Sequence, residues 1–298
     1  MKASNNIGSY FAVIIAVSIW AVSYVFTAQA LKDFRPLSII TLRISLAVLF
    51  MFIYAKATKQ LQPMEKKDRR FFILTGMIQP FIYFVSETYG LQLLSPTLAS
   101  VMLSTMPLFA PFFAYAFLRE KFTWNNIVGI VVSLCGVMLL IFEKEQLVVK
   151  PLGIVLVIIC ITTAILYNVA LRKVPSHYNN VSIVFYVHLS SLLFFYPTWC
   201  LVDLPHIHEM TFSWTAFGSV LVLALFASTT AYILYAGVVR TIGITRAAAF
   251  SNLQPGFTAL FVWIMFGESL PWIKWVGISI VILGLFVSQI SFKRKTSL

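Results

Sequence analysis

The feature that most constrains this chain is the recurrence of apolar runs long enough to cross a lipid bilayer as helices, which takes about 20 residues. Ten such runs recur along the 298 residues. They lie at about 8–30, 36–55, 71–91, 97–118, 124–142, 152–171, 181–201, 214–239, 245–266 and 272–291. Each run is about twice as long as a membrane β-strand and lacks its two-residue alternation. The sequence therefore predicts an all-α integral membrane protein with about ten transmembrane helices.

Composition and charge support the same class of protein. Hydrophobic residues make up 60% of the chain and charged residues 11%, which is more apolar surface than a soluble core of this size can bury. The net charge of +12 does not indicate nucleic acid, because the basic residues stand in short clusters between the apolar runs. With the N-terminus inside, about 16 Lys and Arg lie in inner segments and only five in outer ones. We therefore expect an inner or plasma membrane protein with both termini in the cytoplasm.

An internal repeat divides the chain into two halves, residues 1–146 and 147–298. A shift of about 148 residues superposes eight pairs of identical residues. They include Pro107 on Pro255, Glu120 on Glu268, Trp124 on Trp272 and Gly136 on Gly284. Because each half holds five spans, an odd number, the second half is inverted relative to the first. Inverted repeats are the way in which many secondary transporters build one solute site near the middle of the membrane.

Three stretches carry a resemblance to a known family: TMPLFAPFFAYAFLREKFTWNNIVGIVVSLCGV, NLQPGFTALFVWIMFGESLPWIKWVGISIVILGL and PLSIITLR, which ends at Arg43. In these stretches the chain resembles the EamA family of the drug/metabolite transporter superfamily. The resemblance covers essentially the whole chain. It implies a bundle with a central cavity between the halves, peripheral fifth and tenth helices, and export or uptake of amino acids and other small metabolites. Its motifs do not specify the substrate.

Three ionisable residues, Arg43, Glu87 and His188, lie clearly inside the spans, where charge is costly and indicates function. Arg43 and Glu87 share one level, roughly 10 Å from the outer ends of their helices. Three interpretations remain open. The two residues form an ion pair that joins two helices, or Glu87 takes a proton or binds an amine while Arg43 binds a carboxylate, or the two residues have unrelated places in the bundle. His188 is likewise either a packing group or a titrating gate.

Other polar residues extend these positions into two tiers of a predicted substrate cavity. The inversion pairs Tyr24 with Tyr167 and Ser104 with Asn252. The outer tier comprises Tyr24, Arg43, Glu87 and Ser104, and the inner tier Tyr167, Asn168, His188 and Asn252. Trp20 lies between the tiers, near the middle of the membrane. This arrangement suits a semi-polar solute that is released at either side.

Prolines interrupt several of the predicted spans. Pro107 and Pro255 are expected in the middle of their helices, where each removes a backbone hydrogen bond and kinks the span. Such symmetric kinks serve either as hinges for alternating access or as fixed bends. Gln79 and Pro80 predict a further break in the third span.

Two features of the repeat are interpreted as structural. Glu120 and Glu268 stand in the short turns before the fifth and tenth spans, where their carboxylates are expected to cap the amides of the next helix. Small residues form one face on each of these spans: Gly129, Ser133 and Gly136 on the fifth, Gly277 and Gly284 on the tenth. They predict close packing, either inside the bundle or against a second copy in a homodimer.

The sequence contains no motif of a phosphate-binding loop, a zinc protease or a serine hydrolase, so we predict neither an enzyme nor an ATP-driven pump. An outer loop gathers residue types that bind metals, namely Asp203, His206, His208 and Glu209. We interpret this loop as solvated and predict no metal or cofactor.

The leading hypothesis is a secondary transporter that exports amino acids or related small metabolites by alternating access. Its partners are then a small-molecule solute and membrane lipid, and Glu87 and His188 are the candidates for proton coupling. The alternatives are a drug or toxic-compound exporter, an uptake permease, and a membrane enzyme or lipid-handling protein that uses the same polar groups.

Overall fold

The computed structural model of the chain describes residues 2–93, 102–103, 105–120, 123–141, 150–209, 212–266 and 271–289. The first repeat contains α1 (Lys2–Ala30), α2 (Pro36–Ala57), η1 (Lys66–Asp68), α3 (Arg69–Gly76), η2 (Met77–Ile82), α4 (Tyr83–Leu93), α6 (Met106–Leu118) and α7 (Trp124–Ile141). The second contains α8 (Pro151–Lys173), α9 (Asn180–Val202), η3 (Leu204–Glu209), α10 (Trp214–Val222), η4 (Leu223–Thr230), α11 (Ala231–Ile242), α12 (Ile244–Ala249), η5 (Phe250–Asn252), α13 (Leu253–Phe266) and α14 (Trp272–Gln289).

Six helical stretches in the described ranges are long and apolar enough to cross a membrane, and three shorter apolar helices accompany them. The prediction of an all-α membrane protein of about ten helices is confirmed. The predicted boundary between the halves, at residues 146 and 147, lies outside the described residues.

Local sequence signals set several of the helix starts. Pro36 and Pro151 stand in the first turn of α2 and α8, where a residue without an N–H loses no helical hydrogen bond. The side chain of Asn179 caps α9 by accepting a hydrogen bond from the Ser182 amide at 2.8 Å. These caps define where the chain enters the bundle, but they do not determine which helices meet inside it.

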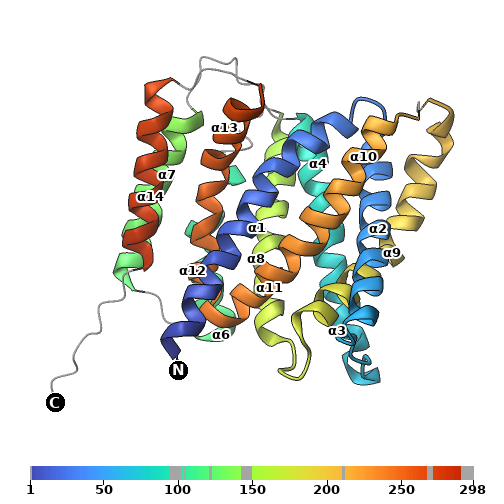
Figure 1. Cartoon of the computed structure of the whole chain (residues 1–298), viewed down its shortest axis with the longest axis horizontal. Coiled ribbons are helices and arrows are strands. Elements are labelled where there is room, and N and C mark those ends of the chain that lie inside the picture. The colour runs from blue at the N-terminus through green and yellow to red at the C-terminus, as the bar shows by residue number, and fades with distance from the viewer. Residues whose placement is uncertain are drawn as a thin grey trace.

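The helices of the two repeats are interleaved in the bundle. α1 packs on α11 and α13, α4 on α8, α2 on α9, and α7 on α14. α1 and α8, the first helices of the two repeats, run in opposite directions (Figure 1). α1 begins and α14 ends at one end of the bundle, which we call the basic end because it carries the Lys- and Arg-rich loop after α2. The opposite end holds η3 and is called the η3 end.

α7 and α14 lie side by side at one edge of the bundle (Figure 1). A Cβ atom on Gly129 would lie 2.2 Å from the Ser288 nitrogen, and one on Gly284 would lie 2.4 Å from the Ser133 nitrogen. Only residues without a side chain permit this approach. The predicted close packing of the small faces is confirmed, and each face is covered by the other helix of the same chain.

The positions of Pro107 and Pro255 differ from the prediction that they lie in the middle of helices. α6 begins at Met106, directly after a turn at Thr105, so Pro107 stands in its first turn. Pro255 is the third residue of α13 and follows the 3-10 segment η5. The spans are therefore interrupted just before the prolines. Each proline starts the next helix, where its missing N–H removes no intrahelical bond.

Candidate functional site

Tyr232 of α11 lies at the centre of the bundle and is only 4% exposed. Its ring packs edge-on against Trp20 at 5.5 Å, His188 at 5.0 Å and Tyr167 at 6.1 Å between centroids. Its hydroxyl accepts a hydrogen bond from the Gln79 amide nitrogen at 2.9 Å. We call these five residues the central cluster. They come from five elements, two of the first repeat and three of the second, so the cluster exists only where the repeats meet.

Three buried polar atoms of the central cluster have no hydrogen-bond partner among the described residues: Gln79 Oε1, Tyr167 Oη and His188 Nε2. The Nδ1 atom of His188 lies 3.0 Å from the Val184 carbonyl oxygen. Because a carbonyl only accepts, Nδ1 carries the proton, and Nε2 of the neutral ring is an acceptor. The Gln79 oxygen is an acceptor as well. Buried polar groups are normally paired, so these atoms mark a place suited to a hydrogen-bond donor.

Two π-helical segments, η2 and η4, flank the central cluster. They occupy equivalent places in the two repeats, because a shift of about 148 residues superposes them. Irregular backbone at membrane depth is tolerated where it is buried in protein or lines a cavity, and π-helical turns often occur at functional sites. η2 contributes Gln79, whose backbone angles are not helical. η4 contributes Ser228, which is buried beside Arg43.

The structure gives Arg43 and Glu87 separate partners. The Arg43 Nε atom donates to Ser228 Oγ at 2.5 Å, and its guanidinium lies 4.6 Å from the centre of the Phe84 ring. Glu87 accepts a hydrogen bond from the Tyr83 hydroxyl at 2.9 Å. The contacts of the described residues include no ion pair between Arg43 and Glu87, so the interpretation as a direct ion pair is wrong. π-Helical η4 supplies a closer polar partner to the arginine.

Of the two other residues predicted for the outer tier, the structure describes Tyr24. Tyr24 of α1 is close enough to interact electrostatically with both Glu87 and Arg43. It therefore lies near both of them. Ser104 lies outside the described residues.

The inner tier is only partly assembled. Tyr167 and His188 belong to the central cluster, as described above. Asn168 donates to the Tyr235 hydroxyl at 3.4 Å, and the Tyr235 ring packs on Trp20 at 5.1 Å. Asn252 has a different neighbour, because its amide donates to Ser133 Oγ of α7 at 2.9 Å. The structure thus gathers Trp20, Tyr167, Asn168 and His188 around α11 and directs Asn252 towards α7.

Sequence reasoning missed the residues that join these groups, above all Tyr232 and Tyr235. Each is one tyrosine in a long apolar span, where aromatic residues are ordinary. The repeat contained a usable signal. The same shift of 148 residues places Tyr232 on Phe84 and Tyr235 on Glu87, so a search for the residue equivalent to Glu87 would have found Tyr235, which packs on Trp20 beside the centre of the site.

Glu120 caps a helix, but not the helix that follows it. Its Oε2 atom accepts a hydrogen bond from the Ile244 amide at 3.2 Å, at the start of α12, and its Oε1 atom lies 3.0 Å from Arg172 Nε. The start of α7 is capped locally instead, because the Thr123 amide donates to Asn126 Oδ1 at 2.7 Å. Glu120 therefore connects the first repeat to the second at the basic end. Its repeat mate Glu268 lies outside the described residues.

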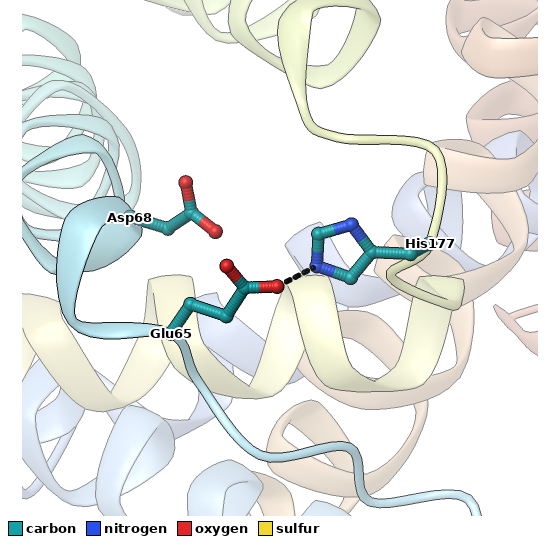
Figure 2. A group of neighbouring side chains, drawn as sticks. All are labelled: Glu65, Asp68 and His177. Atoms are coloured by element: carbon teal, nitrogen blue, oxygen red, sulfur yellow. Dashed lines mark ion pairs between the residues drawn. The ribbon is translucent and has the colours of Figure 1, made fainter.

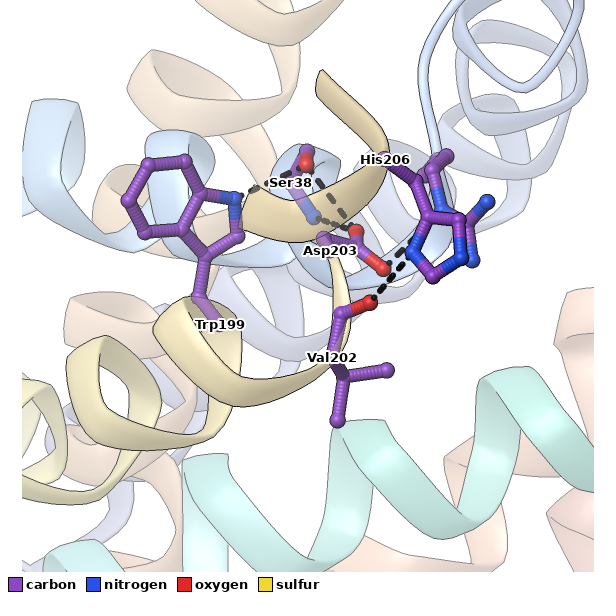
Figure 3. A network of polar contacts seen from close by, with 6 residues as sticks. Ser38, Trp199, Val202, Asp203 and His206 are labelled. Atoms are coloured by element: carbon purple, nitrogen blue, oxygen red, sulfur yellow. Dashed lines mark hydrogen bonds and ion pairs between the residues drawn. The ribbon is translucent and has the colours of Figure 1, made fainter. Parts of the chain in front are cut away.

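Asp203 is not solvated, contrary to our interpretation of its loop. It is 1% exposed and accepts hydrogen bonds from the Ser38 amide at 2.7 Å and the Ser38 hydroxyl at 2.9 Å (Figure 3). Arg35 Nε lies 3.3 Å from its other oxygen, and the Trp199 indole donates to Ser38 Oγ at 2.9 Å. The reason is the free amides at the start of α2, which attract a carboxylate. We call these contacts the Asp203 network.

A second group of acidic and histidine residues lies at the basic end: Glu65, Asp68 and His177 (Figure 2). Glu65 pairs with Lys67 at 2.7 Å and with His177 at 3.2 Å, and Asp68 accepts from the Tyr178 hydroxyl at 2.9 Å. The hydrogen bond from Lys67 lowers the pKa of the exposed Glu65 carboxyl. These contacts join the loop after α2 to the loop after α8, so the group serves as a surface connection between the repeats.

A membrane bundle of two inverted repeats, with a buried polar and aromatic cluster where they meet, is the architecture of a multi-pass membrane transporter. The sequence profile of the EamA-like transporter family matches residues 7–142 and 151–289. The chain belongs to the EamA-like transporter family.

Relatives of the chain are transporters of similar length. The transporter YetK of Bacillus subtilis (strain 168) is 24% identical over 84% of this chain and 77% of the relative. The S-adenosylmethionine/S-adenosylhomocysteine transporter of Chlamydia trachomatis serovar L2 is 24% identical over 88% of this chain and 83% of the relative. A solved crystal structure superposes with a TM-score of 0.76 at 15% identity, over 97% of this chain and 98% of the other. That structure is similar in fold.

Proposed function

We propose that this protein is a secondary transporter that exports amino acids or related amine-bearing metabolites by alternating access, with the central cluster as its binding site. The observation that carries the proposal is the set of three unpartnered atoms around Tyr232. Two of them are acceptors, and a primary ammonium offers three N–H donors. The rings of Trp20 and Tyr232 favour a cation in the same place.

A carboxylate on the same solute would suit Arg43. This residue is buried, and Tyr232 is close enough to interact with its charge. Arginine is the side chain best matched to a carboxylate. A zwitterion would thus meet acceptors at its amine end and a guanidinium at its acid end. The named substrates of the Chlamydia trachomatis relative, S-adenosylmethionine and S-adenosylhomocysteine, also carry an amino-acid group, which supports this class.

The contacts at the two ends of the bundle support alternating access. At the η3 end the Asp203 network connects α2 to α9. At the basic end Gln62 bonds the residues that start α9, including the Asn179 amide at 2.6 Å. The central cluster lies between these two closures. A transporter that opens to either side must break one set of contacts while the other holds.

The test is a ligand-dependent thermal shift of the purified protein, because a ligand stabilises the folded state by mass action. The probes are the 20 amino acids, S-adenosylhomocysteine and matched acids that lack the amine, such as L-phenylalanine against 3-phenylpropionate. We expect stabilisation by an amine-bearing compound and none by its matched acid. Equal stabilisation by both would contradict the amine as the recognised group. Stabilisation by apolar aromatic compounds alone would favour the alternative of a toxic-compound exporter.

A single substitution tests whether the stabilising compound binds at the central cluster. Tyr167→Phe removes one hydroxyl from the central cluster, and we expect about a five-fold weaker affinity for the stabilising compound, the equivalent of one hydrogen bond of about 1 kcal/mol. Tyr54→Phe is the matched control, since Tyr54 is exposed on α2 near the basic end. An unchanged affinity in Tyr167→Phe would remove this hydroxyl from the site.

Proton coupling through Glu87 is part of the same proposal. Besides Tyr83, the groups close enough to interact with its charge are Tyr24 of α1, Arg43 of α2, Cys160 of α8 and Tyr232 of α11. We expect Glu87→Gln to remove the pH dependence of uptake into proteoliposomes while His188→Gln keeps it. The opposite result would assign the coupling to His188.

We also propose that both termini lie in the cytoplasm, since the basic end carries most of the Lys and Arg.

A further inference from the structure

A groove of about 410 Å³ lies between α2 and α9 at the η3 end, away from the central cluster. From α2 it is lined by Ser38, Thr41, Leu42 and Ser45, whose spacing puts them on one face of the helix. Most of the remaining wall is aromatic and includes Tyr196 and Trp199. Ser38 and Trp199 also belong to the Asp203 network (Figure 3). The Asp203 network therefore forms the end of the groove that lies at the start of α2.

The hydroxyl of Thr41 is the polar group in this groove that is left without a partner among the described residues, although Thr41 is only 5% exposed. Threonines elsewhere in the bundle donate to the carbonyl one turn earlier in their own helix, as Thr75 does to Phe71 and Thr198 to Phe194 at 2.8 Å. Ser45, which also lines the groove, donates to the Thr41 carbonyl. The Thr41 hydroxyl is therefore a buried donor in the wall of the groove whose hydrogen bond is not made among the described residues.

The surroundings of the groove indicate what kind of molecule reaches it. Beside it, α2 and α9 expose large apolar side chains: Leu49 is 49% exposed and Leu193 is 61% exposed. Both helices are long and apolar enough to cross the membrane. Such a surface faces hydrocarbon, so the groove opens sideways into the bilayer. Its rim, with Trp199 and Arg35, has the residue types that favour the interface with lipid headgroups.

We propose that this groove binds one acyl chain of a membrane phospholipid, with the Thr41 hydroxyl donating to the ester carbonyl of that chain. The apolar and aromatic walls accommodate the hydrocarbon. The ester carbonyl is the acceptor that a phospholipid presents just below its headgroup, one helical turn beneath the rim. Bound there, the chain would fill the space between α2 and α9 below the Asp203 network and stabilise their spacing at the η3 end.

The test uses the full chain in nanodiscs of phosphatidylethanolamine and phosphatidylglycerol that contain a phospholipid with a diazirine on its acyl chain. After photolysis, adducts are mapped on peptides by mass spectrometry. We expect several-fold more adducts on residues 38–45 and 196–199 than around Leu193. Leu42→Trp fills the groove and should abolish the excess. Leu49→Trp, the same exchange two turns further along α2, is the matched control and should keep it.

A second variant tests the hydrogen bond without changing the volume of the groove. Thr41→Val should weaken retention of one phospholipid in native mass spectra roughly five-fold, and Thr41→Ser should restore it. Labelling that is even over the lipid-facing surface, or unchanged by Leu42→Trp, would overturn the proposal. Adducts displaced by a water-soluble compound that stabilises the protein would also overturn it and would assign the groove to the transported solute.

Discussion

The two ends of the interface between α2 and α9 are held together in different ways. At the basic end, Gln60 and Gln62 of the loop after α2 bond Asn179, Ser182 and other residues around the start of α9 through several side-chain and backbone contacts. At the η3 end, Arg35 and Ser38 of the first repeat meet a single carboxylate, that of Asp203. Among the described residues, the contacts at the basic end are spread over many partners, whereas those at the η3 end converge on Asp203, and the bond from the Trp199 indole to Ser38 supplements them.

This difference indicates which end opens more readily. A typical hydrogen bond contributes about 1 kcal/mol net, so the loss of one contact at the basic end leaves the others in place. The loss of Asp203 releases all three of its contacts at once and leaves partly buried donors without their acceptor. We therefore expect the η3 end to open first, and a membrane groove lies beneath that end.

The largest effect is expected for Asp203→Ala. The start of α2 loses its carboxylate, which should lower the free energy of unfolding by about 2–3 kcal/mol. The measurement is the thermal midpoint of the purified protein in detergent. Asp33→Ala is the control, since Asp33 lies in the neighbouring turn and has no side-chain contact with α9 in the described part of the chain. A midpoint equal to that of Asp33→Ala would contradict the role of Asp203 as the residue on which the η3 end depends.

Gln62→Ala should have a smaller effect at the other end. Its amide donates to the His177 carbonyl and accepts from the Asn179 amide, each at 2.6 Å. Both bonds are lost, but the backbone contacts of Gln60 remain, so we expect a loss of about 1 kcal/mol. The same thermal midpoint measures it. A loss larger than that of Asp203→Ala would reverse the comparison.

Glu120→Gln should change stability less. Gln keeps an acceptor for the Ile244 amide and loses the charge opposite Arg172. Because that pair is partly exposed, at 33% and 19%, we expect about 0.5 kcal/mol at low salt and less as salt is added. Thermal midpoints at two ionic strengths check this. An effect that is independent of salt would point to packing instead of charge.

The smallest effect is expected for Glu65→Gln, because Glu65 and Lys67 are exposed. The folded protein lowers the pKa of Glu65. The carboxylate therefore contributes stability above its ordinary pKa of about 4.3, and this contribution disappears as the pH falls through the lowered value. Wild type and variant should differ by a small amount near neutral pH and converge in acid. A difference that grows in acid would contradict this sign.

The sequence predicted the helices of this protein far better than the contacts between them. Runs of about 20 apolar residues follow from the thickness of the bilayer, and a repeated pattern of Pro, Glu, Trp and Gly implies two halves whatever their packing. The same pattern indicated the small faces that join α7 to α14. Arg43, Glu87 and His188 stood out because charge inside a membrane is costly wherever it lies.

The partners of these residues were decided only by the tertiary structure. Arg43 bonds Ser228 and not Glu87, Glu120 caps α12 and not α7, and Asp203 is buried against α2. Each of these contacts joins residues more than 100 positions apart. Tyr232, the centre of the site, has no special surroundings in the sequence. Local hydrophobicity determines which segments enter the membrane. The hydrogen-bond partner of a polar group in those segments depends instead on which helices of the two repeats pack beside it.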